Sequence, residues 1–134
     1  MTDINGISLL HIAEAPSSRQ SLAEYAEMLG WSVHSTTDHA HGLAIAGKTR
    51  FDAIITEGDG ASSLDGALST EAFAKQLRGP GSPNHRTPII LSDRATSQQS
   101  VGELFDGVLN APIGLNSLRE VIMDALDERV FVGP

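Results

Sequence analysis

Short apolar runs alternate with amphipathic stretches along the whole chain. Short apolar runs are typical of strands that are buried on both faces of a parallel sheet. On this pattern the predicted strands cover residues 7–13, 31–36, 51–56, 87–91 and 107–109, of which 31–36 is the least apolar.

The stretches between these runs have helical spacing. Ser17 with Gln20 three residues later is a capping-box start, and Gly30 is a good helix stop. The other predicted helices cover residues 38–46, 68–77, 97–105 and 115–129, with loops at 58–66 and 79–86. Five strands alternating with five helices predict an α/β fold with a doubly wound five-stranded parallel sheet and helices on both faces.

Length and composition exclude several classes of protein and several kinds of site. With 134 residues, the chain is expected to form a single domain over residues 1–134. The absence of cysteine excludes disulfides, thiolate catalysis and cysteine-ligated zinc or iron–sulfur centres. The formal charge of -8 opposes binding to nucleic acid. No run is long enough to span a bilayer and the first residues do not resemble a signal peptide, so a cytoplasmic protein with no membrane contact is expected.

Functional side chains in such a sheet lie beyond the carboxyl ends of the strands. Here those positions are residues 13–15, 56–59, 92–94 and 110–112. Around them, in order and spacing, the segments LLHIAEAPSSRQSLAEYAEMLGWSV, FDAIITEGDGASSLDG, TPIIL and GVLNAP resemble the receiver domain of bacterial response regulators. The resemblance covers nearly the whole chain. It implies a flavodoxin-like (βα)5 fold with the strand order 2-1-3-4-5 and a place in two-component phosphorelay signalling.

Receivers accept a phosphoryl group on an aspartate after the third strand. An acidic pair holds magnesium, and a hydroxyl and a lysine complete the pocket, because phosphoryl transfer depends on positioning and charge neutralisation. By resemblance, the matching positions are Ala13 and Glu14 for the acidic pair, Glu57 for the acceptor, Ser92 for the hydroxyl (Asp93 in a shifted alignment), Val108 for the switch aromatic and Ala111 for the lysine. The acceptor aspartate, one magnesium ligand, the aromatic and the lysine are therefore missing.

Three interpretations of Glu57 remain open. It accepts phosphate, it imitates a phosphorylated aspartate, or it is a relic whose charge is satisfied by nearby amides or water; we favour the relic. Glu14, Glu57, Asp59 and Asp65 form an expected degenerate acidic pocket. No cofactor and no metal is expected, and the alternative is a magnesium ion held by Glu14 and Glu57.

The histidines are interpreted as structural rather than as metal ligands. His39 and His41 are two residues apart, so they point to different sides of a helix, and a surface helix is expected there. His11 lies inside the first predicted strand and is expected to be buried, neutral and hydrogen-bonded once.

These observations lead to one functional hypothesis with alternatives. The chain is expected to be a non-enzymatic pseudo-receiver that binds proteins independently of phosphorylation. The resemblance implies a contact face, also the face of a homodimer, on the predicted helix 97–105, strand 107–109 and helix 115–129, with the residues Gln98, Gln99, Glu103, Val108 and Arg119.

The partners implied are a histidine kinase, a phosphotransfer protein or an output domain, and the first helix with Arg19, Tyr25 and Met28 is a second candidate surface. The first alternative is a receiver held active by Glu57 as a phosphoaspartate mimic. The more remote one is a small α/β enzyme or flavin-binding domain, although no nucleophile or phosphate-binding turn is evident.

Overall fold

The computed structural model describes residues 7–13, 16–57, 70–93, 106–110 and 113–132. The strands are β1 (Ser8–Ile12), β2 (Ser32–Thr36), β3 (Ala53–Glu57), β4 (Ile89–Asp93) and β5 (Gly107–Asn110). The helices among these residues are α1 (Pro16–Leu29), α2 (His39–Ala46), α3 (Thr70–Leu77) and α4 (Leu115–Val132). All strand pairs are parallel, in the order β2-β1-β3-β4-β5, which confirms the predicted sheet. The predicted helix 97–105 and loop 58–66 lie outside the described residues.

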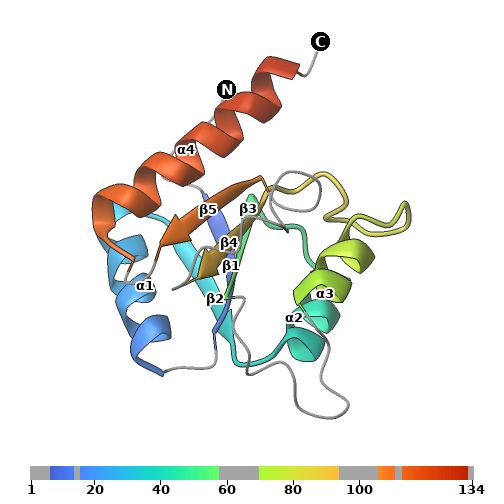
Figure 1. The fold of residues 1–134 in the computed structure, drawn as a ribbon, viewed down its shortest axis with the longest axis horizontal. Helices are drawn as coiled ribbons and strands as arrows, with labels where there is room; N and C mark the ends of the chain where they lie inside the picture. The colour runs from blue at the N-terminus through green and yellow to red at the C-terminus, as the bar shows by residue number, and fades with distance from the viewer. Residues whose placement is uncertain (1–6, 14–15, 58–69, 94–105, 111–112, 133–134) are drawn as a thin grey trace.

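Helices cover the sheet on both faces, with α1 and α4 on one side and α2 and α3 on the other (Figure 1). Adjacent strand residues divide between the two sides because side chains alternate along a strand. Leu9, Ile55 and Ile90 pack with residues of α1 and α4, whereas Ile54 and Ile89 pack with residues of α2 and α3. This double burial explains why the strands appear in the sequence as apolar runs rather than as alternating patterns.

The third and fourth strands begin two residues later than the sequence predicts, because polar side chains bind the first residues of both apolar runs. The Phe51 N–H donates to Asn84 Oδ1 (2.8 Å), and the Thr87 hydroxyl lies 3.1 Å from the Phe51 carbonyl oxygen and 2.9 Å from Asn84 Oδ1. The Asn84 amide also donates to the carbonyls of Ala46 (2.7 Å) and Thr49 (2.8 Å). Asn84 is fully buried, and its hydrogen bonds join the 79–86 loop to the connection between α2 and β3.

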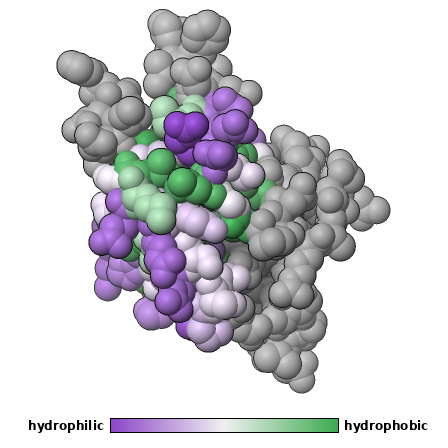
Figure 2. Space-filling view, turned by 90° about the vertical axis from the view of Figure 1, so that its left-hand side faces the viewer, coloured by the Kyte–Doolittle hydropathy of each residue, from purple (hydrophilic) through white to green (hydrophobic). Residues whose placement is uncertain are grey.

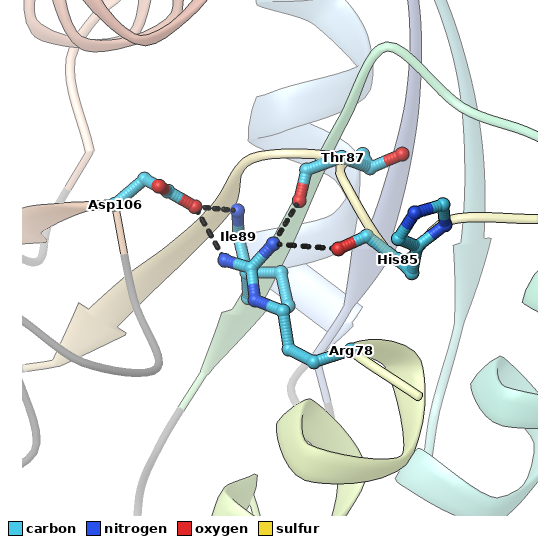
Figure 3. A network of polar contacts seen from close by, with 5 residues as sticks. All are labelled: Arg78, His85, Thr87, Ile89 and Asp106. Atoms are coloured by element: carbon cyan, nitrogen blue, oxygen red, sulfur yellow. Dashed lines mark hydrogen bonds and ion pairs between the residues drawn. The ribbon is translucent and has the colours of Figure 1, made fainter. Parts of the chain in front are cut away.

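Arg78 makes a second polar junction at the same edge of the sheet, as Figure 3 shows. Its guanidinium contacts the Asp106 carboxylate (2.6 Å) and donates to the Thr87 carbonyl (2.9 Å). Asp106 in turn accepts from the Ile89 N–H (2.9 Å). Arg78 directly follows α3, Thr87 lies just before β4, and Asp106 lies just before β5. Their contacts therefore link the end of α3 to the starts of β4 and β5.

A glycine allows α2 to lie close to the sheet. A Cβ on Gly42 would come within 2.9 Å of Ile12 Cδ1, which is too close for carbon atoms. His39 and Ala46 share the buried side of the helix with Gly42, at spacings of three and seven residues. No helix within the described ranges is long and apolar enough to cross a membrane.

Truncation of a central isoleucine tests this double burial. Ile54 and Ile90 are both fully buried, one on each face, so Ile54→Ala or Ile90→Ala should each lower the free energy of unfolding by about 2–5 kcal/mol. Urea denaturation with an unchanged m-value is the measurement. Met28→Ala, at a residue that is 69% exposed, should stay within about 0.5 kcal/mol of wild type. A loss below about 1 kcal/mol at either isoleucine would contradict its placement in a central strand.

Candidate functional site

The strand ends bring several predicted site residues to one edge of the sheet. Thr56 in β3 is paired with Ile12 of β1, and the next residue, Glu57, is paired with Ser92 of β4. Asp93 is paired instead with Asn110 of β5. The register therefore puts Ser92, and not Asp93, beside Glu57.

Ser92 is buried, with 2% of its surface exposed. Its hydroxyl oxygen has no hydrogen-bond partner among the residues that the structure describes. A buried hydroxyl without a partner costs free energy, and such groups in native proteins are concentrated at sites that do chemistry or bind something. Ser92 therefore places a buried polar group near the carboxyl end of β4.

Arg19 contacts the end of the first strand. Ala13 is buried immediately after β1, and its N–H donates to the Thr36 carbonyl (3.0 Å). The Ala13 carbonyl accepts from Arg19 Nη1 at 2.7 Å, so α1 supplies a guanidinium to this strand end. From the sequence, Arg19 was predicted only as part of a contact surface, and its role at the strand end was missed. Its position one turn into a helix that follows the strand directly is the signal that could have suggested it.

His11 is a buried titratable group in β1, one residue before the end of that strand. It is fully buried in β1, as predicted, between Ser35 of β2 and Ile55 of β3 in register. Burial and, to a smaller extent, the positive charge of Arg19 lower the pKa of His11 to about 4. The ring is therefore neutral at physiological pH.

His39 differs from its prediction. It was expected on a surface helix, but it is buried, with 8% of its surface exposed. Its Nε2 and the Thr56 hydroxyl are 2.6 Å apart, and its ring is tilted by 53° against the Phe73 ring, with the ring centroids 5.1 Å apart. Asp38 caps α2 by accepting from the His41 N–H, which puts His39 in the first turn, directed at the sheet, while His41 remains exposed. The spacing to Gly42 and Ala46 was the available signal.

Other predicted residues are only partly placed. Val108 of β5 is paired with Leu91 of β4, and Arg119 is exposed on α4. The remaining predicted residues lie outside the described part of the chain: Glu14, Asp59, Asp65, Gln98, Gln99, Glu103 and Ala111. Within that described part, no group of three or more His, Cys, Asp or Glu residues is arranged to hold a metal ion.

Solved structures similar to this one are receiver domains. The chemotaxis response regulator CheY4 of Vibrio cholerae has a TM-score of 0.77 and 24% identity, over 90% of this chain and 98% of that one. A receiver domain protein from Clostridium thermocellum gives 0.77 and 16% identity, over 94% and 98%. The chain has the fold of a response regulator receiver domain.

A third similar structure carries a metal ion. It is the receiver domain of the sensor histidine kinase PA1611 from Pseudomonas aeruginosa PAO1, with magnesium coordinated in the active site cleft (TM-score 0.76, 19% identity, 91% of this chain and 98% of that one). No family model and no curated protein sequence matches the present chain.

The described residues at the end of β1 do not fit a magnesium ion. Magnesium requires oxygen ligands, usually one or two carboxylates. Ala13 provides no side-chain oxygen, and its carbonyl already accepts from the Arg19 guanidinium at 2.7 Å. A second cation placed at this carbonyl would be repelled by the first.

The neutral state of His11 has a consequence for stability. The folded-state pKa of about 4 lies below the unfolded value of 6.5, so as the pH falls the unfolded chain takes up the proton first. Stability should therefore be lost as the pH drops below about 6.5, amounting to about 2 kcal/mol between pH 7 and pH 5. Urea unfolding at both pH values measures the difference.

A matched pair of variants isolates this contribution. His11→Leu should remove most of the loss between the two pH values, whereas His41→Gln, at an exposed ring, should retain it. If His11→Leu loses as much stability as wild type between pH 7 and pH 5, His11 is not the group responsible.

Proposed function

We propose that the protein is a pseudo-receiver, a protein-interaction module of two-component signalling that works without aspartyl phosphorylation. The contact of Arg19 with the Ala13 carbonyl carries the proposal. In a receiver an acidic pair at this strand end holds the magnesium on which phosphoryl transfer depends. Here Ala13 stands at one of the two acidic positions, and its carbonyl accepts from a guanidinium. A guanidinium donates hydrogen bonds but has no coordination sites, so it does not replace a metal ion that coordinates a donor phosphate and an acceptor carboxylate together.

The residues at the other positions support the same conclusion. Glu57 is longer than aspartate by one methylene, so an acceptor oxygen there is displaced by more than 1 Å, roughly the misplacement that costs 100-fold in rate. Ala111 offers no ammonium to stabilise the transferred charge. The function proposed is consequently binding rather than catalysis, with a histidine kinase, a phosphotransfer protein or an output domain as the class of partner.

A second candidate is a receiver held permanently in its active state. The pairing of Glu57 with Ser92 in the β3–β4 register favours it, because a buried hydroxyl stands beside the carboxylate-bearing residue. Against it, a charge shifts an equilibrium only through contacts that differ between two states. The lysine and aromatic positions that would make those contacts are Ala111 and Val108. We therefore rank this mimicry second.

The first test is chemical. Incubation with acetyl phosphate and Mg²⁺ should leave the intact mass unchanged, because the acceptor aspartate and the lysine are both missing. The triple variant Ala13→Asp, Glu57→Asp, Ala111→Lys serves as a control that reinstates the receiver pattern, and a gain of one phosphoryl group there would show that the assay detects the reaction. A stoichiometric gain by wild type, lost in Glu57→Gln, would refute the proposal.

The second test separates a relic from a mimic. Glu57→Gln and Glu57→Ala should leave the affinity for a partner obtained by co-purification within about threefold, or about 0.7 kcal/mol. Arg119→Glu, on the exposed side of α4, should weaken binding more if the contact face implied by the resemblance is used. A tenfold loss on neutralising Glu57, with an unchanged circular dichroism spectrum, would favour constitutive mimicry instead.

A further inference from the structure

A groove of about 440 Å³ lies between the end of α1 and α4. Its lining consists of Leu29, Trp31, Arg119, Glu120, Met123 and Asp124. Leu29 and Trp31 stand at the end of α1 and the start of β2, which is the edge of the sheet opposite to Glu57 and Ser92. The groove is thus separate from the candidate site at the strand ends.

The floor of the groove is apolar. Trp31 belongs to the core cluster on this face, and Leu29 and Met123 pack against that cluster while remaining partly exposed. Met28, the neighbour of Leu29, is 69% exposed and is the one exposed large apolar side chain among the described residues. On this side of the molecule apolar surface gathers in a patch that hydrophilic residues border (Figure 2). Apolar patches with a polar rim are typical of contact surfaces.

The rim of the groove is acidic. Glu120 and Asp124 are exposed one turn apart on α4, with Arg119 as the single basic residue of the lining. None of the three forms a salt bridge with another of the residues that the structure describes. The chain as a whole carries a formal charge of -8, so the surrounding potential has the same sign as the rim.

This charge discriminates between possible occupants. In a two-fold dimer the same patch faces itself, which would set four carboxylates against two guanidinium groups. Such a contact leaves like charges opposed and is disfavoured. A partner segment that carries lysine or arginine beside an apolar stripe matches both the floor and the rim.

We propose that this groove binds a basic amphipathic helix of another protein. Apolar side chains at positions i and i+4 of that helix would enter the space over Trp31, Leu29 and Met123. Lysine or arginine residues on its flanks would meet Glu120 and Asp124. The inference deepens the interaction role proposed above, since it names a surface and a partner chemistry. It does not depend on the residues at the strand ends.

Trp31 provides a direct readout because it is the single tryptophan of the chain and lines the groove. Two synthetic helical peptides without tryptophan serve as probes. They share leucines at i, i+4 and i+7 and differ only in flanking residues, which are lysine in one and glutamate in the other. The lysine peptide should change the Trp31 emission in a saturable manner that weakens with salt. The glutamate peptide should leave the emission unchanged.

Two double variants with equal changes in charge locate the binding. Glu120→Gln with Asp124→Asn should weaken the lysine peptide about fivefold, the effect of two exposed ion pairs. Glu24→Gln with Glu27→Gln, on exposed positions of α1 outside the groove lining, should leave its affinity within about twofold. Because the groove is separate from the carboxyl ends of the strands, Glu57→Gln should also leave the affinity for the lysine peptide unchanged. Circular dichroism checks that each variant is folded.

Four results would overturn the inference. The lysine peptide fails to change the Trp31 emission, or both peptides change it equally. The two double variants weaken binding to the same extent, which indicates attraction to the overall negative charge. Trp31 emission changes with protein concentration alone, in step with dimer formation in sedimentation, which identifies a second copy as the occupant. A failure here leaves the phosphorylation test untouched, so the two proposals are judged separately.

Discussion

Burial of the central strands on both faces is the constraint on which the rest of the structure depends. In β1, β3 and β4 adjacent residues such as Ile54 and Ile55 are each fully buried, but against different helices. A shift of one residue in register would exchange the two sets of side chains and disrupt both clusters. The register is therefore fixed, and with it the pairing that sets Glu57 beside Ser92. The geometry of the candidate site follows from packing that contains none of its polar groups.

Because of this separation, the fold does not depend on the polar residues at the strand ends. The apolar clusters supply the stability, whereas charges at the strand ends supply chemistry. Ala13 is buried at the end of β1, and its carbonyl accepts from Arg19. The same guanidinium contributes to keeping His11 neutral. A cation from α1 thus contacts the end of β1, and this contact is the observation on which the proposed binding role rests.

The edge of the sheet where the strands begin and the edge where they end differ in their polar contacts. Asn84 and Arg78 hydrogen-bond to several backbone carbonyls at the edge where β3 and β4 begin, and they tie loops and helix ends to the strands. At the other edge, Ser92 keeps a buried hydroxyl without a partner among the described residues. The groove between α1 and α4 lies near the well-connected edge.

The sequence by itself determined the parallel sheet and the helices among the described residues, because apolar runs and helical spacing record burial locally. The strand order was predicted through the resemblance to receiver domains. It also predicted that His11 lies in the core, since a histidine inside a buried apolar run is buried together with that run. Only the tertiary structure decided between Ser92 and Asp93, since register is a relation between two strands. The burial of His39 and the contact of Arg19 with Ala13 were likewise decided by how α2 and α1 pack against the sheet. Strand starts at Ala53 and Ile89 depended on Asn84, a loop residue more than 30 positions from Phe51, and no local pattern contains such a long-range hydrogen bond.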